Sequence, residues 1–422
     1  MHLKNGGVGM VVPSTFWLGL SYFTYFFSFG IFLPFWSVWL KGEGIEPSMI
    51  GILLGIGLVS RFIGSLIISP TVKDPAKLIK ALRLLSLLAL LFSVGFVCGS
   101  HWAWLFLVMI GFNLFFSPLV PLSDALAGTW QKQFTFDYGK VRVWGSVAFI
   151  ISSSLTGILM SADGINFSIS GLDFDGNISF DRLNGWIGRD LFGTHHIILA
   201  FLVFSITLML LGMMLKPSIM PVGKIKAANT NAVSFKELLS EKSVRQFLAC
   251  VTLLQAAHAG YYSFGSIYWE QAGYSSSTIG YLWSLGVVAE VVVFTFSNRL
   301  FRRWSARNLL LLSGICGVVR WGLMGISTEL PVLIIIQILH CGTFTVCHLA
   351  AMRFIGARKE NEIIRLQATY SALAMGGGIA VMSVMAGFMY EHIGYGIFWV
   401  MALVALPALF LRPKVEAHAI SG

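Results

Sequence analysis

The chain has 422 residues, of which 56% are hydrophobic and only 11% charged, and its formal net charge is +10. Soluble domains carry roughly a quarter charged residues, so this composition excludes an ordinary soluble enzyme or binding module. Such a chain needs lipid as its solvent, and runs of about 20 apolar residues are long enough to cross a bilayer.

Apolar runs of that length recur along the chain and predict an all-α integral membrane protein with twelve transmembrane helices. The first run is too long for a cleavable signal peptide and lacks a basic leader, so we expect it to be retained. The predicted spans are residues 15–40, 47–70, 78–98, 102–127, 140–161, 194–215, 244–269, 276–298, 307–326, 330–356, 363–390 and 393–411.

The distribution of basic residues predicts the orientation of these helices. An even number of spans places both chain ends on one side, and all but five of the 29 Lys and Arg residues fall on that side. The exceptions are Lys41, Arg182 and Arg189 on the other side, and Arg61 and Arg320 inside helices. By the positive-inside rule both termini are cytoplasmic, and the positive charge reports topology rather than nucleic-acid binding.

The longest basic connection divides the predicted helices into two groups of six. We predict an N-terminal bundle at 1–215, a cytoplasmic linker at 216–243 and a C-terminal bundle at 244–422. Basic loops at 72–83 and 298–308 occupy corresponding places in the two halves, as expected of transporters built from repeats. This pattern favours a major-facilitator architecture.

A polar insertion at 162–193 contains a partial calcium-loop pattern. An EF-hand loop requires glycine at its sixth position and glutamate at its twelfth, where this chain has Ile178 and Asn184. A solvated acidic loop is therefore the preferred interpretation. The weak calcium candidates are Asp173, Asp175, Asn177, Ser179 and Asp181.

Charged residues within or beside the predicted helices of the first half are functional hypotheses, because burying charge in lipid is costly. Asp124 ends the fourth span and Arg142 begins the fifth, so the two can meet across the short loop between them. They form either a salt bridge that fixes a hairpin or a charge pair that lines a cavity. Arg61 has no acidic neighbour in sequence, and its planar guanidinium group can bind a carboxylate or phosphate of a substrate through two parallel hydrogen bonds.

The second half carries a carboxylate in an apolar stretch, Glu290 in "GVVAEVVVFTF". A carboxylate in such a setting suits a proton carrier, and Arg320 is its expected partner, with a static ion pair as the alternative. His340 is expected to face the cavity and to hydrogen-bond with substrate or Glu290. The alternative is a core histidine satisfied by a neighbouring helix.

Several long motifs resemble bacterial 3-phenylpropionic acid transporters of the major facilitator superfamily over nearly the full chain. They include "MIGFNLFFSPLVPLSDALA", "DYGKVRVWGSVAF" and "QILHCGTFTVCHLAAMRF". The insertion at 162–193 is the departure. The resemblance implies a bacterial inner-membrane transporter for a small aromatic carboxylate.

A more distant similarity is to the lactose permease group. The acid and arginine that hold the sugar there fall on Asp124 and Arg142, and its later arginine and histidine fall on Arg320 and His340. Another helix-7 acid of that group falls on His258. The acid that it uses for proton coupling falls on Thr343, so coupling must be carried by other groups here.

The sequence thus predicts a proton symporter that imports 3-phenylpropionate or a related aromatic carboxylate by alternating access. The expected substrate-binding residues are Arg61, Asp124, Arg142 and His258, and the expected proton-coupling residues are Glu290, Arg320 and His340. We expect no cofactor beyond the proton, a monomer in lipid, and no nucleic-acid partner. Enzyme motifs such as HExxH, a nucleophile elbow or a phosphate loop do not stand out.

Two alternatives stay open. The first is a proton-coupled sugar or nucleoside symporter, which an Asp124–Arg142 pair would also suit. The second is a non-transporting membrane sensor, against which stands the lack of a soluble output domain in the sequence.

Overall fold

The computed structural model describes residues 10–161, 167–169, 172–174, 194–222 and 234–413. Ten helical stretches among these residues are long and apolar enough to cross a membrane. One stretch, Asn361–Leu409, holds two helical segments separated at Gly394, where a positive φ of 52° ends the first of them. A further segment, 242–271, is interrupted at its centre. The predicted all-α fold is confirmed, and the predicted spans coincide with helical segments of the described chain to within a few residues.

The N-terminal half begins and ends at a short parallel strand pair, β1 (Val11–Val12) with β4 (Lys216–Pro217). Its helices are α1 (Ser14–Gly42), α2 (Pro47–Thr71), α3 (Leu78–Gly95) between the short turns η1 (Pro75–Lys77) and η2 (Phe96–Cys98), α4 (Trp102–Phe116), α5 (Leu119–Gln133), α6 (Tyr138–Met160) and α9 (His196–Met214). Within the insertion, β2 (Phe167–Ile169) pairs with β3 (Leu172–Phe174) as an antiparallel hairpin.

The C-terminal half contains several helices interrupted by short irregular turns. Its elements are α10 (Phe235–Ser240), α11 (Lys242–Ala256), α12 (Ala259–Gln271), α13 (Ser276–Leu300), α14 (Ala306–Ile326), α15 (Leu330–Ile338), η3 (Cys341–Thr345), α16 (Val346–Gly356), α17 (Glu360–Tyr370), η4 (Ser371–Gly377), α18 (Gly378–Ile393), η5 (Gly394–Gly396), α19 (Ile397–Ala405) and η6 (Leu406–Leu409). Of these turns, η3 and η4 are π-helical. Ser275 and Ser305 cap the starts of α13 and α14 with their hydroxyls, which satisfy backbone N–H groups that lack a helical partner.

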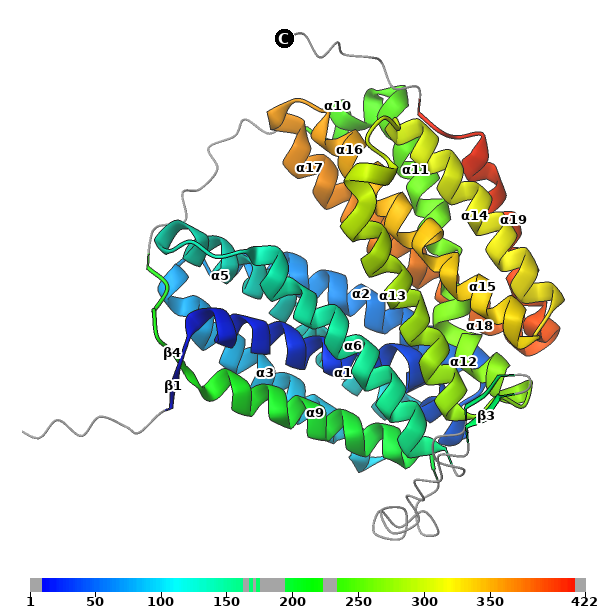
Figure 1. Ribbon diagram of the computed structural model, residues 1–422, viewed down its shortest axis with the longest axis horizontal. Helices are drawn as coiled ribbons and strands as arrows, with labels where there is room; N and C mark the ends of the chain where they lie inside the picture. The colour runs from blue at the N-terminus through cyan, green and yellow to red at the C-terminus, as the bar shows by residue number, and fades with distance from the viewer. Residues whose placement is uncertain (1–9, 162–166, 170–171, 175–193, 223–233, 414–422) are drawn as a thin grey trace, which may run out of the picture.

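Two faces of the molecule are defined by its turns. The termini face carries β1, β4 and the connection between α5 and α6. The opposite face carries the α1–α2 turn at Glu43–Glu46 and the α12–α13 turn at Ala272–Ser275. The two halves lie against each other near the opposite face, around α12, and spread apart towards α5 and α17 at the termini face (Figure 1).

Close helix crossings join the halves towards the opposite face. Helix α6 passes α13 so closely that a Cβ built on Gly157 would lie 2.3 Å from the Ser276 carbonyl oxygen. Helix α2 meets α18 in the same way, because a Cβ built on Gly51 would lie 2.8 Å from Gly387 Cα. Small residues that allow backbones to approach are typical of helix contacts in membranes.

Side-chain hydrogen bonds between the halves also lie towards the opposite face. Ser284 of α13 is 2.8 Å from the hydroxyls of both Ser153 and Ser154 of α6. At the opposite face, Lys41 of α1 pairs with Glu270 of α12 at 2.7 Å. In the described part of the chain, the side-chain hydrogen bonds that join the halves lie between the middle of the bundle and this face. The molecule is therefore closed at the opposite face and separated at the termini face.

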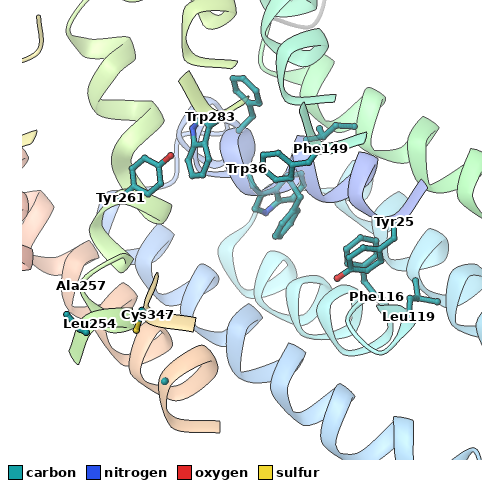
Figure 2. Close-up of a cluster of buried hydrophobic side chains, with 14 of the residues drawn as sticks. Tyr25, Trp36, Phe116, Leu119, Phe149, Leu254, Ala257, Tyr261, Trp283 and Cys347 are labelled. Carbon is teal, nitrogen blue, oxygen red and sulfur yellow. The ribbon is translucent and has the colours of Figure 1, made fainter. Parts of the chain in front are cut away.

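Aromatic side chains fill the interior of both halves (Figure 2). Tyr25 stacks on Phe116 in the N-terminal half with ring centres 4.3 Å apart, and Tyr261 stacks on Trp283 in the C-terminal half at 4.4 Å. Trp283 donates its indole N–H to Ser266 Oγ at 2.9 Å, and Ser266 donates in turn to a backbone carbonyl of α1 at 2.5 Å. The aromatic core therefore continues from one half into the other.

Candidate functional site

A hydrogen-bonded network in the C-terminal half surrounds Arg320 of α14, which is completely buried. Its guanidinium donates to the Ile336 carbonyl at 2.9 Å, to His340 Nδ1 at 2.8 Å and to Thr343 Oγ1 at 3.0 Å. The guanidinium carbon also lies 4.6 Å from the centre of the Tyr261 ring. These contacts compensate a charge that would be very costly to bury alone.

The pattern of donors determines the tautomer of His340. Arginine has only donors, so Nδ1 of His340 must accept the hydrogen bond from Arg320 and carries no proton. In a neutral imidazole the proton then lies on Nε2, which donates to Glu290 Oε1 at 2.7 Å. Arg320, His340 and Glu290 thus form a chain in which the imidazole separates the two charged groups.

This series of hydrogen bonds corrects the expected partner of Glu290 and confirms the expected contact of His340. The sequence predicts Arg320 as the partner of Glu290, but the group in contact with the carboxylate belongs to His340. The Arg320 guanidinium donates its hydrogen bonds to the Ile336 carbonyl and to His340. The imidazole of His340 therefore lies between Arg320 and Glu290. The predicted hydrogen bond from His340 to Glu290 is present. The Glu290 side chain is 16% exposed and that of His340 is 8% exposed, so both are largely removed from water.

His258, at the break between α11 and α12, belongs to the same network. Its Nδ1 lies 3.0 Å from the Leu254 carbonyl, which only accepts, so this nitrogen carries a proton. Its Nε2 lies 3.0 Å from Thr343 Oγ1. Thr343 lies in the π turn η3, directly after His340, and π turns inside helices are frequent at functional sites. His258 is thus placed beside Arg320 and not beside Arg61.

Arg61 lies near the middle of α2, where the two halves meet. Its guanidinium carbon is 4.6 Å from the centre of the Phe29 ring, and none of the ion pairs in the described chain includes it. A cavity of about 50 Å³ adjoins it, which is room for a few water molecules because each needs ~10–15 Å³. The polar lining comprises Ser37, Arg61 and Asn113 from the N-terminal half and Tyr262, Ser263 and Ser383 from the C-terminal half.

Tyr262 of α12 connects this cavity with the network in the C-terminal half. One side of the residue lines the cavity that Arg61 also lines. Its ring centre lies 5.5 Å from that of His258 and 6.5 Å from that of His340. A ligand beside Arg61 would therefore be one aromatic side chain away from the histidine that holds Glu290.

The predicted charge pair between Asp124 and Arg142 is wrong. No ion pair joins them among the described residues, and both side chains instead contact Tyr22. The Tyr22 hydroxyl donates to Asp124, and the centre of its ring is 5.0 Å from the guanidinium carbon of Arg142. Tyr138 donates a second hydrogen bond to the same carboxylate oxygen at 2.8 Å. The carboxylate is satisfied by phenol groups, and the arginine rests on aromatic faces.

Several of these contacts were beyond sequence reasoning. Tyr22 and Tyr262 lie in runs of aromatic residues, and composition does not distinguish members that line an interface from members that face lipid. Tyr138 precedes Arg142 by one helical turn, which was an available signal. Thr343 follows His340 by three residues, a spacing that places both on one helix face.

Of the five weak calcium candidates, one lies in a described element. Asp173 lies in β3. Asp175, Asn177, Ser179 and Asp181 lie outside the described residues.

Two six-helix halves, joined at one face and with charged side chains at and beside their interface, define a secondary transporter of the major-facilitator type. Comparison with a crystal structure of a mutant of the nucleoside transporter NupG gives a TM-score of 0.78 at 14% sequence identity, covering 94% of this chain and 98% of that one, which supports the fold. The MFS_1 like family model matches residues 15–401, and the chain belongs to this family. It is a multi-pass membrane transporter and not an enzyme.

Two relatives bear on the resemblances seen in the sequence. The "Probable 3-phenylpropionic acid transporter" of Escherichia coli is 61% identical over 406 residues, which cover 96% of this chain and 99% of that protein. The lactose permease of Citrobacter freundii is 23% identical over 300 residues, which cover 67% of this chain and 64% of that protein. Both predicted resemblances, the near one and the distant one, are confirmed.

Proposed function

We propose that the protein is a proton symporter that imports 3-phenylpropionate or a related small aromatic carboxylate. One observation carries this proposal, which is the position of Tyr262 between two charged sites. On one side lies Arg61, which has no carboxylate partner, at a cavity between the halves. On the other side lies the Glu290 carboxylate, which is held by the buried His340. The first group suits an anionic substrate, and the second suits a proton that is taken up and released. The name of the E. coli relative supports the substrate class.

In this proposal Arg61 binds the carboxylate of the substrate. Its guanidinium matches a carboxylate bidentately, and a ligand anion would supply the counter-charge that the protein does not. Phe29 and Tyr262 offer aromatic faces beside it for the phenyl ring. Arg142, whose guanidinium carbon lies 4.4 Å from the centre of the Phe26 ring, is the second cation on the way to the termini face, and Tyr22 contacts both Arg142 and Asp124.

Glu290 carries the coupled proton, and His340 positions it. While Arg320 donates to Nδ1 of His340, a second proton on that ring would break the hydrogen bond and add a cation beside a buried arginine. The carboxylate of Glu290 is free of this restriction. One substrate anion and one proton would then cross together without net charge. His258 supports Thr343 and Arg320 in this scheme and does not touch substrate in the present conformation.

Transport would proceed by alternating access. In the proposed orientation the termini face lies on the cytoplasmic side of a bacterial inner membrane, as the positive-inside rule indicates. The separated termini face then corresponds to an inward-facing state, and the glycine crossings of α2 with α18 and α6 with α13 form the closed outer side. Rocking of the halves about the Arg61 cavity would open that side. A single chain contains both halves, so we propose a monomer.

The test is uptake of labelled 3-phenylpropionate into membrane vesicles that contain the protein. An imposed pH gradient, acidic outside, should drive accumulation, and a protonophore should abolish it. A membrane potential imposed without a pH gradient should have no effect, because the co-transport is electroneutral. Uptake that ignores the pH gradient would refute proton coupling. Uptake of a sugar or nucleoside in its place would refute the substrate class.

A further inference from the structure

A compact group of three side chains lies at the opposite face, apart from the transport site. Glu43 follows the last residue of α1, and His195 and His196 lie at the start of α9. One donor atom of each lies within 4.8 Å of the donor atoms of the other two. The side chains are 13% exposed for Glu43, 24% for His195 and 39% for His196. The group is therefore partly buried, yet reachable from solvent.

The distances from Glu43 to the two histidines are long for hydrogen bonds and compatible with shared binding of a metal ion. Glu43 Oε1 lies 3.5 Å from His195 Nε2 and 3.2 Å from His196 Nδ1. Both exceed the ~2.7–2.9 Å that is usual for charge-assisted N–H···O bonds, and the first also exceeds the ~3.2 Å limit of ordinary ones. Ligand atoms of a tetrahedral zinc ion, with bonds of ~2.0–2.1 Å, lie roughly 3.3 Å apart. The two separations from Glu43 fall on either side of this value, and the two histidine nitrogens lie within 4.8 Å of each other.

The surrounding chain holds the ligands in place. A Cβ built on Gly42 would lie 2.4 Å from His195 Cγ, so the absence of a side chain there lets the imidazole pack against the end of α1. The two imidazole rings are 4.1 Å apart between centres. The two histidines and Glu43 are therefore brought together by the packing of the end of α1 against the start of α9.

We propose that Glu43, His195 and His196 form a binding site for a divalent zinc ion at the opposite face. Two imidazole nitrogens and one carboxylate oxygen are a ligand set that zinc takes in proteins, with water in the fourth position. Calcium and magnesium require oxygen ligands and are excluded by the two nitrogens. A bound ion would tie the end of α1 to the start of α9, two residues from Lys41, which pairs with Glu270 of the other half.

Zinc binding by the intact, purified protein in detergent tests this proposal, measured by isothermal titration calorimetry after removal of any histidine tag. The parent should bind one zinc ion per chain at this site. His195→Gln, His196→Gln and Glu43→Gln should each weaken binding by at least about tenfold, since even changes in groups behind the ligands cost ~10–100-fold. His392→Gln alters an exposed histidine near the end of α18 and should leave binding unchanged.

Cobalt absorption provides a second measurement that does not depend on folding of the variants. Co²⁺ bound to the parent should show the visible band of a low-coordinate ion, and added Zn²⁺ should remove it. Zinc should also raise the thermal midpoint of the parent and of His392→Gln, but not that of the three ligand variants. A parent that binds no zinc, a cobalt spectrum equal to that of the aqueous ion, or ligand variants that bind like the parent would each overturn the proposal.

Discussion

Arg61 and Arg142 of the N-terminal half differ from Arg320 of the C-terminal half in their protein partners. In the C-terminal half, Arg320 is fully buried and is joined through His340 to Glu290 in a continuous chain of hydrogen bonds. In the N-terminal half, Arg61 and Arg142 rest on aromatic rings, and in the described structure neither pairs with a carboxylate. One half neutralises its cation internally, whereas the other leaves two cations available.

This difference assigns different tasks to the two halves. A cation on an aromatic face keeps its hydrogen-bonding fork available to an anion that arrives from outside. A cation with several protein partners is fixed, and its effect is to orient the groups around it. The N-terminal half is therefore suited to hold the substrate, and the C-terminal half to hold the proton.

The largest effect is expected for Glu290→Gln, which imitates the protonated carboxylate permanently. Accumulation of 3-phenylpropionate against a gradient should be abolished, because no proton is released. Exchange of internal for external substrate should persist, because exchange needs no net proton movement. Vesicle uptake under an imposed pH gradient and counterflow without one measure the two activities separately.

Glu329→Gln is the matched control for this variant, because Glu329 is an exposed carboxylate just before α15. It should accumulate substrate like the parent. If Glu290→Gln also accumulates substrate like the parent, Glu290 is only a structural partner of His340. The proposal that the C-terminal half holds the coupled proton would then be wrong.

Arg61→Lys should weaken substrate affinity strongly, because a point charge does not replace a planar fork. Hydrogen bonds to charged groups contribute ~1.5–3 kcal/mol, which corresponds to a rise in KM of roughly 10–100-fold. The concentration dependence of counterflow gives KM without a contribution from the proton. Arg302→Lys, in an exposed loop, should retain the parental KM. An unchanged KM in a well-expressed Arg61→Ala variant would remove Arg61 from the substrate site.

His340→Gln distinguishes a positioning residue from a proton carrier. The amide offers one acceptor towards Arg320 and one donor towards Glu290, so it preserves part of the chain. We expect accumulation to persist at a reduced rate, about fivefold lower for the loss of ~1 kcal/mol of hydrogen bonding. His340→Phe, which offers neither group, should lose accumulation. If His340→Gln fails to accumulate while it still exchanges substrate, the proton resides on the histidine.

Tyr22→Phe should have the smallest effect, since it removes only the hydroxyl that donates to Asp124 and keeps the ring beside Arg142. Asp124 retains the hydrogen bond from Tyr138, so the free energy of unfolding should fall by only ~0.5–1.5 kcal/mol. Thermal unfolding in detergent measures this change, and Tyr395→Phe, an exposed tyrosine, is the control. Tyr22→Ala should reduce transport further, because Arg142 then loses an aromatic support. Equal transport in both variants would show that the ring does not position Arg142.

The amino-acid sequence is sufficient to identify the class of the protein. The lengths of its apolar runs specify twelve spans because a bilayer imposes one length on every helix that crosses it. Rare charges within those spans drew attention to Arg61, Glu290, Arg320 and His340, because lipid makes such residues costly to retain without a use. These inferences needed no knowledge of which helices are neighbours.

Which polar groups contact each other depends on the packing of the helices. Sequence reasoning paired Glu290 with Arg320, and Asp124 with Arg142, on the attraction of opposite charges alone. In the structure an imidazole joins the first pair, and the members of the second each contact the same tyrosine. Hydrogen bonds and ring contacts act over only a few ångströms, so the partner of each charge is set by how helices distant in sequence pack side by side. That packing is not encoded in the periodicity of any single helix.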